Sequence, residues 1–150
     1  MKVDYFTIPE ITVSYKDNVK TSERAIIGST KDAAKILAIA FEDCMQHHEE
    51  VYVLFLNRAM RVLGISNVAK GGVNGAAVDI RIILQIALKV SASFITISHN
   101  HPSGSVRPSA DDLVMTKTIQ RGCEAIGIKL LDHVIMAEES YCSFADEGLL

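Results

Sequence analysis

The chain has 150 residues, enough for one domain whose core needs no disulfide bonds. Its 15 basic and 18 acidic residues give a formal charge of −3, which disfavours nucleic acid as a bulk electrostatic partner. No apolar run approaches the roughly 18 residues of a membrane span, and the three widely spaced cysteines fit reduced thiols, so we expect a cytoplasmic protein with no membrane partner and no targeting segment.

The hydrophobic pattern predicts strands and helices in alternation. Short apolar groups up to about Gly28 indicate one or two strands, and residues 28–48 then follow helical spacing, with Ser29 as the cap and Asp32 in the capping-box position. Residues 51–57 and 60–69 form a hairpin-like pair of strands, and residues 71–75 form a glycine-rich loop. The remaining predicted elements are a largely buried helix over 78–92, a central strand over 93–99, a helix over 110–127, a strand over 129–137, and an edge strand or tail over 140–148. The alternation predicts a layered α/β domain with a mixed sheet.

The stretch HNHPSGSVRPSADD, residues 99–112, carries most of the chemistry. In an extended strand, His99 and His101 face one side and Asn100 faces the other. Prolines and a glycine then turn the chain, and Asp111 and Asp112 fall in the first turn of the next helix, so an aspartate can return to the histidines. Two imidazoles and a carboxylate are a common ligand set for catalytic zinc, which keeps a fourth position for water.

The spacing is His-x-His, seven residues, Ser109, two residues, Asp112. This resembles the JAMM motif of the JAB/MPN metalloproteases, a family that includes the zinc isopeptidases that remove ubiquitin. The bacterial RadC-type members are the more similar, on HNHPSG, the later PS and the aspartate, and the resemblance extends from about Glu49 to the end through VLFLN, VDIR and LLDHVIM. It implies the cytidine-deaminase-like α/β fold, a mixed sheet flanked by helices. It also implies that His99, His101 and Asp112 bind Zn²⁺ and that Ser109 stabilises the tetrahedral intermediate, which leaves Asp111 as a cap or a solvent-facing charge.

The family also requires an upstream glutamate as general base. Glu49 and Glu50 both precede the strand of residues 51–57 and must face opposite sides of it, so only one can reach the water. The distance back from Asn57, where RadC-like sequences often have aspartate, favours Glu49 over Glu50. The resemblance then implies hydrolysis of a peptide or isopeptide bond by a zinc-bound water, with a peptide or protein, ubiquitin-like proteins included, as the substrate.

Other interpretations stay open. The chain could be a non-catalytic, metal-containing module that binds a protein or DNA, because ligands alone do not prove catalysis. A nuclease, suggested by the letters HNH, fits least, since the two histidines are neighbours on one strand. Long RadC proteins carry a helix-hairpin-helix-like region ahead of the part that resembles this chain, and fewer than fifty residues precede Glu49 here. We therefore expect residues 1–150 to be a single RadC-like JAB/MPN domain without that region, and we leave the oligomeric state open.

Several residues have plainer interpretations. Ser109 and Asp112 by themselves also predict an ordinary helix cap. The other candidate side chains are expected to be structural: His47 and His48 solvated at a helix end, His133 a strand histidine, Cys123 and Cys142 core or half-buried thiols, and Arg81 in a salt bridge or equally well at the substrate.

Overall fold

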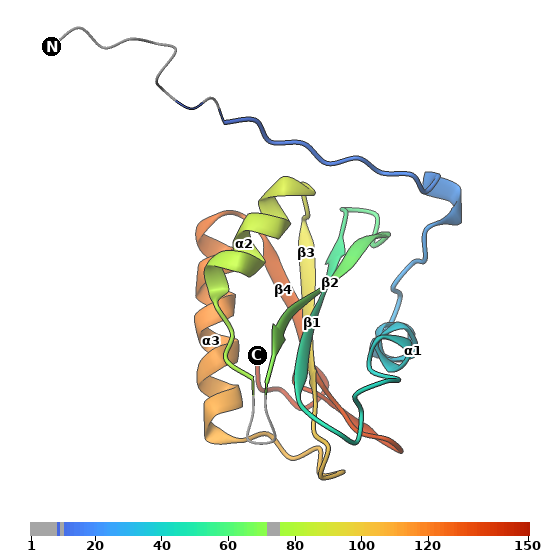
Figure 1. Ribbon diagram of the computed structural model, residues 1–150, viewed down its shortest axis with the longest axis vertical. Coiled ribbons are helices and arrows are strands. Elements are labelled where there is room, and N and C mark those ends of the chain that lie inside the picture. Colours follow the sequence, from blue (N-terminus) through green and yellow to red (C-terminus); the bar gives the residue numbers. More distant parts are fainter. Residues whose placement is uncertain (1–8, 10, 72–75) are drawn as a thin grey trace, which may run out of the picture.

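The computed structural model describes residue 9 and residues 11–71 and 76–150. Its centre is a five-stranded mixed sheet in the order β2-β1-β3-β4-β5 (Figure 1). The strands are β1 (Glu50–Leu56), β2 (Val62–Lys70), β3 (Phe94–Asn100), β4 (Lys129–Met136) and β5 (Tyr141–Ser143). Strands β3 and β4 are parallel and the other neighbours are antiparallel. The predicted α/β class, the hairpin and the central position of the strand over residues 93–99 are confirmed.

Helices cover both faces of this sheet. Helices α2 (Ile80–Lys89) and α3 (Ala110–Ala125) lie on one face, and α1 (Thr30–Ala40) lies on the other (Figure 1). Alternate residues of β1 therefore enter two separate apolar cores. Val53 packs in the core that contains Ile83 of α2, and Leu54 packs in the core that contains Leu37 of α1. Burial on both faces explains why β1 is a nearly continuous apolar run.

Helix α1 begins where the sequence predicted and ends earlier. The Ser29 hydroxyl oxygen accepts the N–H of Asp32, as a capping residue does. The helix ends at Ala40, although helical spacing continues through Cys44. Phe41 and Cys44 are still buried, because the chain turns back toward the start of β1 with both side chains directed inward. Apolar spacing alone did not distinguish this turn from a further helical turn.

Two other expectations were wrong. The described residues before Gly28 contain no strand, only a 3-10 turn, η2 (Thr21–Glu23), and one bridge between Ile26 and Arg61. Residues 11–20 are all exposed and pass the end of the sheet as an extended trace (Figure 1). Tyr15 donates its hydroxyl to the Leu63 carbonyl of β2 at 2.7 Å, but no residue of this segment forms a backbone ladder with a strand. Helix α2 is also less buried than predicted, because only one side of it meets the sheet: Leu88 is 58% exposed.

The predicted loop over residues 71–75 lies, apart from Gly71, outside the described residues. None of the helices in the described part of the chain is long and apolar enough to cross a bilayer.

Candidate metal centre and its cavity

Three candidate ligands converge where β3 ends and α3 begins. The Nε2 atoms of His99 and His101 lie 2.9 Å apart, Oδ1 of Asp112 lies 3.2 Å from His99 Nε2, and Oδ2 lies 3.7 Å from His101 Nε2. Ligand atoms about 2.0–2.2 Å from a tetrahedral zinc ion stand roughly 3.3–3.6 Å apart. The three side chains therefore fit a cation of that size, with one coordination position left open. The alternation predicted for residues 99–101 and the return of the aspartate are both found.

The start of α3 combines an ordinary cap with this arrangement. The Ser109 Oγ accepts the N–H of Asp112 at 3.0 Å, and Oδ2 of Asp112 accepts the N–H of Ser109 at 2.7 Å, which is a full capping box. The cap leaves Oδ1 of Asp112 facing His99. Since Ser109 Oγ is an acceptor in this bond, its hydroxyl hydrogen can still be donated into the cavity. The cap and the ligand role are compatible.

The charge state of Asp112 suits a ligand. Burial, to 8% exposure, by itself raises the pKa of this carboxyl group. The neighbouring His99 ring and the hydrogen bond from the Ser109 backbone outweigh burial and hold the pKa of this carboxyl group well below its ordinary value. The side chain is therefore an anion already in place for a cation.

A chain of hydrogen bonds fixes which nitrogen of His99 carries the proton. The Thr116 hydroxyl donates to the carbonyl oxygen of Asp112 at 2.6 Å, so its oxygen can only accept from His133 Nδ1, also at 2.6 Å. With its proton on Nδ1, His133 accepts at Nε2 from His99 Nδ1, 2.8 Å away. His99 Nε2 is thus left unprotonated, with its lone pair on the side of the other two ligands.

His101 is oriented by the loop that follows it. Its Nδ1 lies 2.6 Å from the backbone oxygen of Ser105, which can only accept, so the proton lies on Nδ1 and Nε2 is free to bind a cation. The turn depends on Gly104, which has φ +84° and donates its N–H to the carbonyl of His101 at 3.0 Å. A left-handed residue without a Cβ is easily accommodated there.

A cavity of about 750 Å³ opens over the three candidate ligands. Glu49, Ser109 and Asp111 also line it, together with an apolar wall from β1, α2 and α3. Glu50 points away from the cavity to the α1 side of the sheet and is 5% exposed. The predicted division of the two glutamates between opposite faces is therefore present, and the catalytic role of Glu49 stays a prediction.

Some of the other residues considered from the sequence have the environment that was predicted, and others do not. Arg81 forms an exposed salt bridge with Asp79, 2.7 Å away at the start of α2, and Cys123 and Cys142 are buried and half-buried as predicted. His133 is no ordinary strand histidine, because it is fully buried against the candidate metal centre of His99, His101 and Asp112, which is called the first centre below. The sequence does place a histidine on each of two apolar strands, His99 and His133, but their contact depends on the pairing of β3 with β4. His48 was predicted to be solvated, and it instead contacts Glu50 at 2.7 Å.

Comparison with known proteins shows which family the chain belongs to. A family model described as RadC-like JAB domain matches residues 27–149. A UPF0758 protein of Flavobacterium johnsoniae is 40% identical over 123 residues, which are 82% of this chain and 53% of the relative. UPF0758 proteins of Porphyromonas gingivalis and Carboxydothermus hydrogenoformans are 43% and 44% identical over 68% and 67% of this chain, and over 45% of each relative. The chain therefore spans about half the length of the curated relatives that it matches.

Proposed function

Because this chain belongs to the family of RadC-like JAB domains, we propose that it is a metal-dependent hydrolase of the JAMM type that cleaves peptide or isopeptide bonds. One observation carries the proposal: Glu49, Ser109 and the ligand set His99, His101 and Asp112 all line one cavity. A base, a hydroxyl donor and a cation site are the groups that amide hydrolysis requires within reach of one carbonyl.

The donor set supports a zinc-like cation, held by His99, His101 and Asp112. Two neutral imidazoles and a carboxylate suit Zn²⁺, although Mn²⁺ and Fe²⁺ accept the same ligands. When bound, the cation would lower the pKa of a water molecule and polarise the amide carbonyl.

The protein's own groups then move the protons and hold the charge. The Glu49 carboxylate takes the proton of the attacking water and later delivers it to the leaving nitrogen. The Ser109 hydroxyl, whose oxygen is fixed by the Asp112 N–H, donates to the carbonyl oxygen as negative charge develops on it. The apolar wall of the cavity provides contact area for the flanking residues of a peptide.

The decisive variant is Glu49→Gln. It keeps the shape of the side chain and removes its ability to accept a proton, so peptide turnover should fall by roughly 10²–10⁴-fold while metal stays bound. Asp111→Asn is the matched control, because it changes a second carboxylate at the same cavity that the mechanism does not use. Metal content is measured in wild type and in His101→Ala, which should lose the cation of this centre.

Cleavage is measured on a peptide library and on ubiquitin-like fusions with the metal-loaded protein. Unchanged turnover in Glu49→Gln with metal retained would remove Glu49 as the base. A loaded wild-type protein that cleaves no substrate and binds a protein or DNA tightly would instead establish the non-catalytic binding module.

A further inference from the structure

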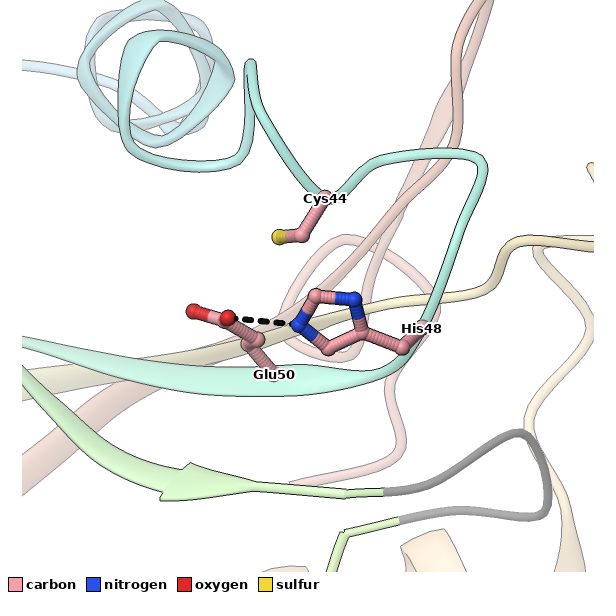
Figure 2. A group of neighbouring side chains, drawn as sticks. All are labelled: Cys44, His48 and Glu50. Carbon is pink, nitrogen blue, oxygen red and sulfur yellow. Dashed lines mark hydrogen bonds and ion pairs between the residues drawn. The ribbon is translucent and has the colours of Figure 1, made fainter.

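A second group of metal-ligating side chains lies on the α1 side of the sheet (Figure 2). Cys44, His48 and Glu50 each present one ligand atom there, and the three atoms lie within 4.8 Å of one another. Cys44 is 3% exposed and Glu50 is 5% exposed, while His48 is half-buried and places Nε2 at 2.7 Å from Glu50 Oε1. The first centre lies on the opposite face of the sheet. Val51 pairs with His99 and lines the large cavity, and Glu50, the adjacent residue in β1, points to the other face because side chains alternate along a strand.

We propose that Cys44, His48 and Glu50 form a second metal site that binds a zinc-like divalent cation. Thiolate, imidazole and carboxylate are the three ligand types that zinc takes in proteins. Ligands at 2.0–2.3 Å from a tetrahedral ion stand roughly 3.3–3.8 Å apart, so small side-chain rotations close the site. Three protein ligands leave one position for water.

The charges of the cluster favour this occupant. The Cys44 thiol releases its proton when it binds a metal, and a divalent cation then neutralises the thiolate together with the Glu50 carboxylate, both in a poorly solvated place. Glu50 Oε2 is already bound by the Asn67 amide, which leaves Oε1 for His48 and the cation. Lys70 Nζ lies 3.7 Å from Oε1, but its side chain is 70% exposed and can turn into solvent when the cation binds.

The backbone of the site is held in place by one side chain. The two N–H groups of the Asn100 amide are shared among the carbonyl oxygens of Cys44 and Met45, each at 3.2 Å, and of His48, at 2.9 Å. The Oδ1 atom of Asn100 accepts the N–H of Glu50 at 2.8 Å. The segment that carries all three ligands is therefore ordered before any cation arrives. Such preorganisation reduces the entropy lost on binding.

The location of the second site gives it a structural role. Glu49 lies between His48 and Glu50 in the chain, and its carbonyl oxygen accepts the N–H of Gly71 at 2.8 Å. A cation at the second site would restrain both neighbours of Glu49, which faces the large cavity on the other side of the sheet. This link to catalysis depends on the proposed function, but the second site itself does not.

Cobalt(II) titration tests the second site separately from the first. A cobalt–thiolate bond gives a charge-transfer absorption in the near ultraviolet, whereas the first centre has no sulfur ligand. His101→Ala, which disables the first centre, should still bind one cobalt ion with this band, and Cys44→Ser in the same background should lose it. Cys142→Ser is the matched control, since it removes a half-buried thiol outside the cluster and should keep the band.

A second variant covers the case in which Cys44→Ser does not fold. His48→Asn changes a half-buried side chain and should weaken cobalt binding in the His101→Ala background by at least about 10-fold. The proposal is overturned if folded His101→Ala protein shows no thiolate band with excess cobalt, or if the band survives Cys44→Ser. Absence of peptide cleavage would contradict the proposed function and leave a positive cobalt result intact.

Discussion

Replacing Thr116 by valine tests how the first candidate centre keeps the Nε2 nitrogen of His99 unprotonated. Thr116 is 1% exposed and valine has nearly its shape, so the change removes the hydroxyl and little else. His133 Nδ1–H then loses the acceptor that lies 2.6 Å away in the native protein. His133 can avoid a buried, unpaired donor by moving its proton to Nε2. That nitrogen would then donate to His99 Nδ1, and the proton of His99 would have to move to Nε2, the atom directed at the cation.

The size of the effect follows from the cost of the lost partner. A buried donor without an acceptor costs about 1–3 kcal/mol. A bound cation requires His99 Nε2 to be unprotonated. In the variant, this moves the protons back to Nδ1 of His99 and Nδ1 of His133, and the His133 Nδ1–H then has no acceptor. The binding free energy should therefore drop by about 1.4–2.7 kcal/mol, a 10–100-fold loss of zinc affinity at one decade per 1.36 kcal/mol.

Zinc affinity is measured by competition with a chelator, and the proton positions are measured by nitrogen NMR of the histidine rings in the metal-free protein. Thr118→Val is the matched control, because Thr118 lies on the same helix and donates to the Val114 carbonyl at 2.9 Å, but is exposed and has no histidine partner. Native zinc affinity in Thr116→Val, with the His133 proton still on Nδ1, would refute the proposed proton order.

Two further predictions concern stability. Burial raises the pKa of Asp132 despite the hydrogen bonds from Ser143 and the Ala145 N–H. A raised pKa in the folded state contributes stability that is fully present below the unfolded value of 3.8 and is lost as the pH rises through the folded-state pKa. Asp132→Asn should therefore flatten the pH dependence of the unfolding free energy above about pH 4. Unfolding free energies from urea titrations at pH 4 to pH 7 that change with pH as much in the variant as in the wild type would contradict this. Asn100→Ala should cost about 2–4 kcal/mol in urea unfolding, because the Glu50 N–H and the carbonyls of Met45 and His48 lose this partner, while the Cys44 carbonyl keeps backbone N–H donors. The control Ser98→Ala loses one bond, to the Val134 carbonyl, so equal costs for the two variants would show that Asn100 does not hold the segment.

The parts of the fold that were predictable are those set by short repeats. A period of two places His99 and His101 on one face whatever the rest of the chain does, and the Ser29 cap is a local arrangement of four residues. The segment before Gly28 shows the limit of this approach. Its alternating apolar residues match a strand, but a strand also needs a neighbour to accept its hydrogen bonds, and the sequence does not specify one.

The site divides in the same way. Its three ligands follow a spacing within fourteen residues, so the sequence could predict them. His133 and Thr116 could not be found like this, because their contact with His99 depends on the pairing of β4 with β3 and on the packing of α3 against both. The cluster at Cys44, His48 and Glu50 depends on the turn after α1, which the helical spacing obscured.

Asn100 connects the two faces of the sheet through the same alternation. It stands between His99 and His101, so its side chain must point away from the first centre, and there it binds the segment that carries the second cluster and Glu49. The residue between the two histidines is consequently constrained by the far side of the sheet. Substitution of Asn100 should therefore disturb both metal groups at once, whereas substitution of Cys44 should leave the three ligands of the first centre in place.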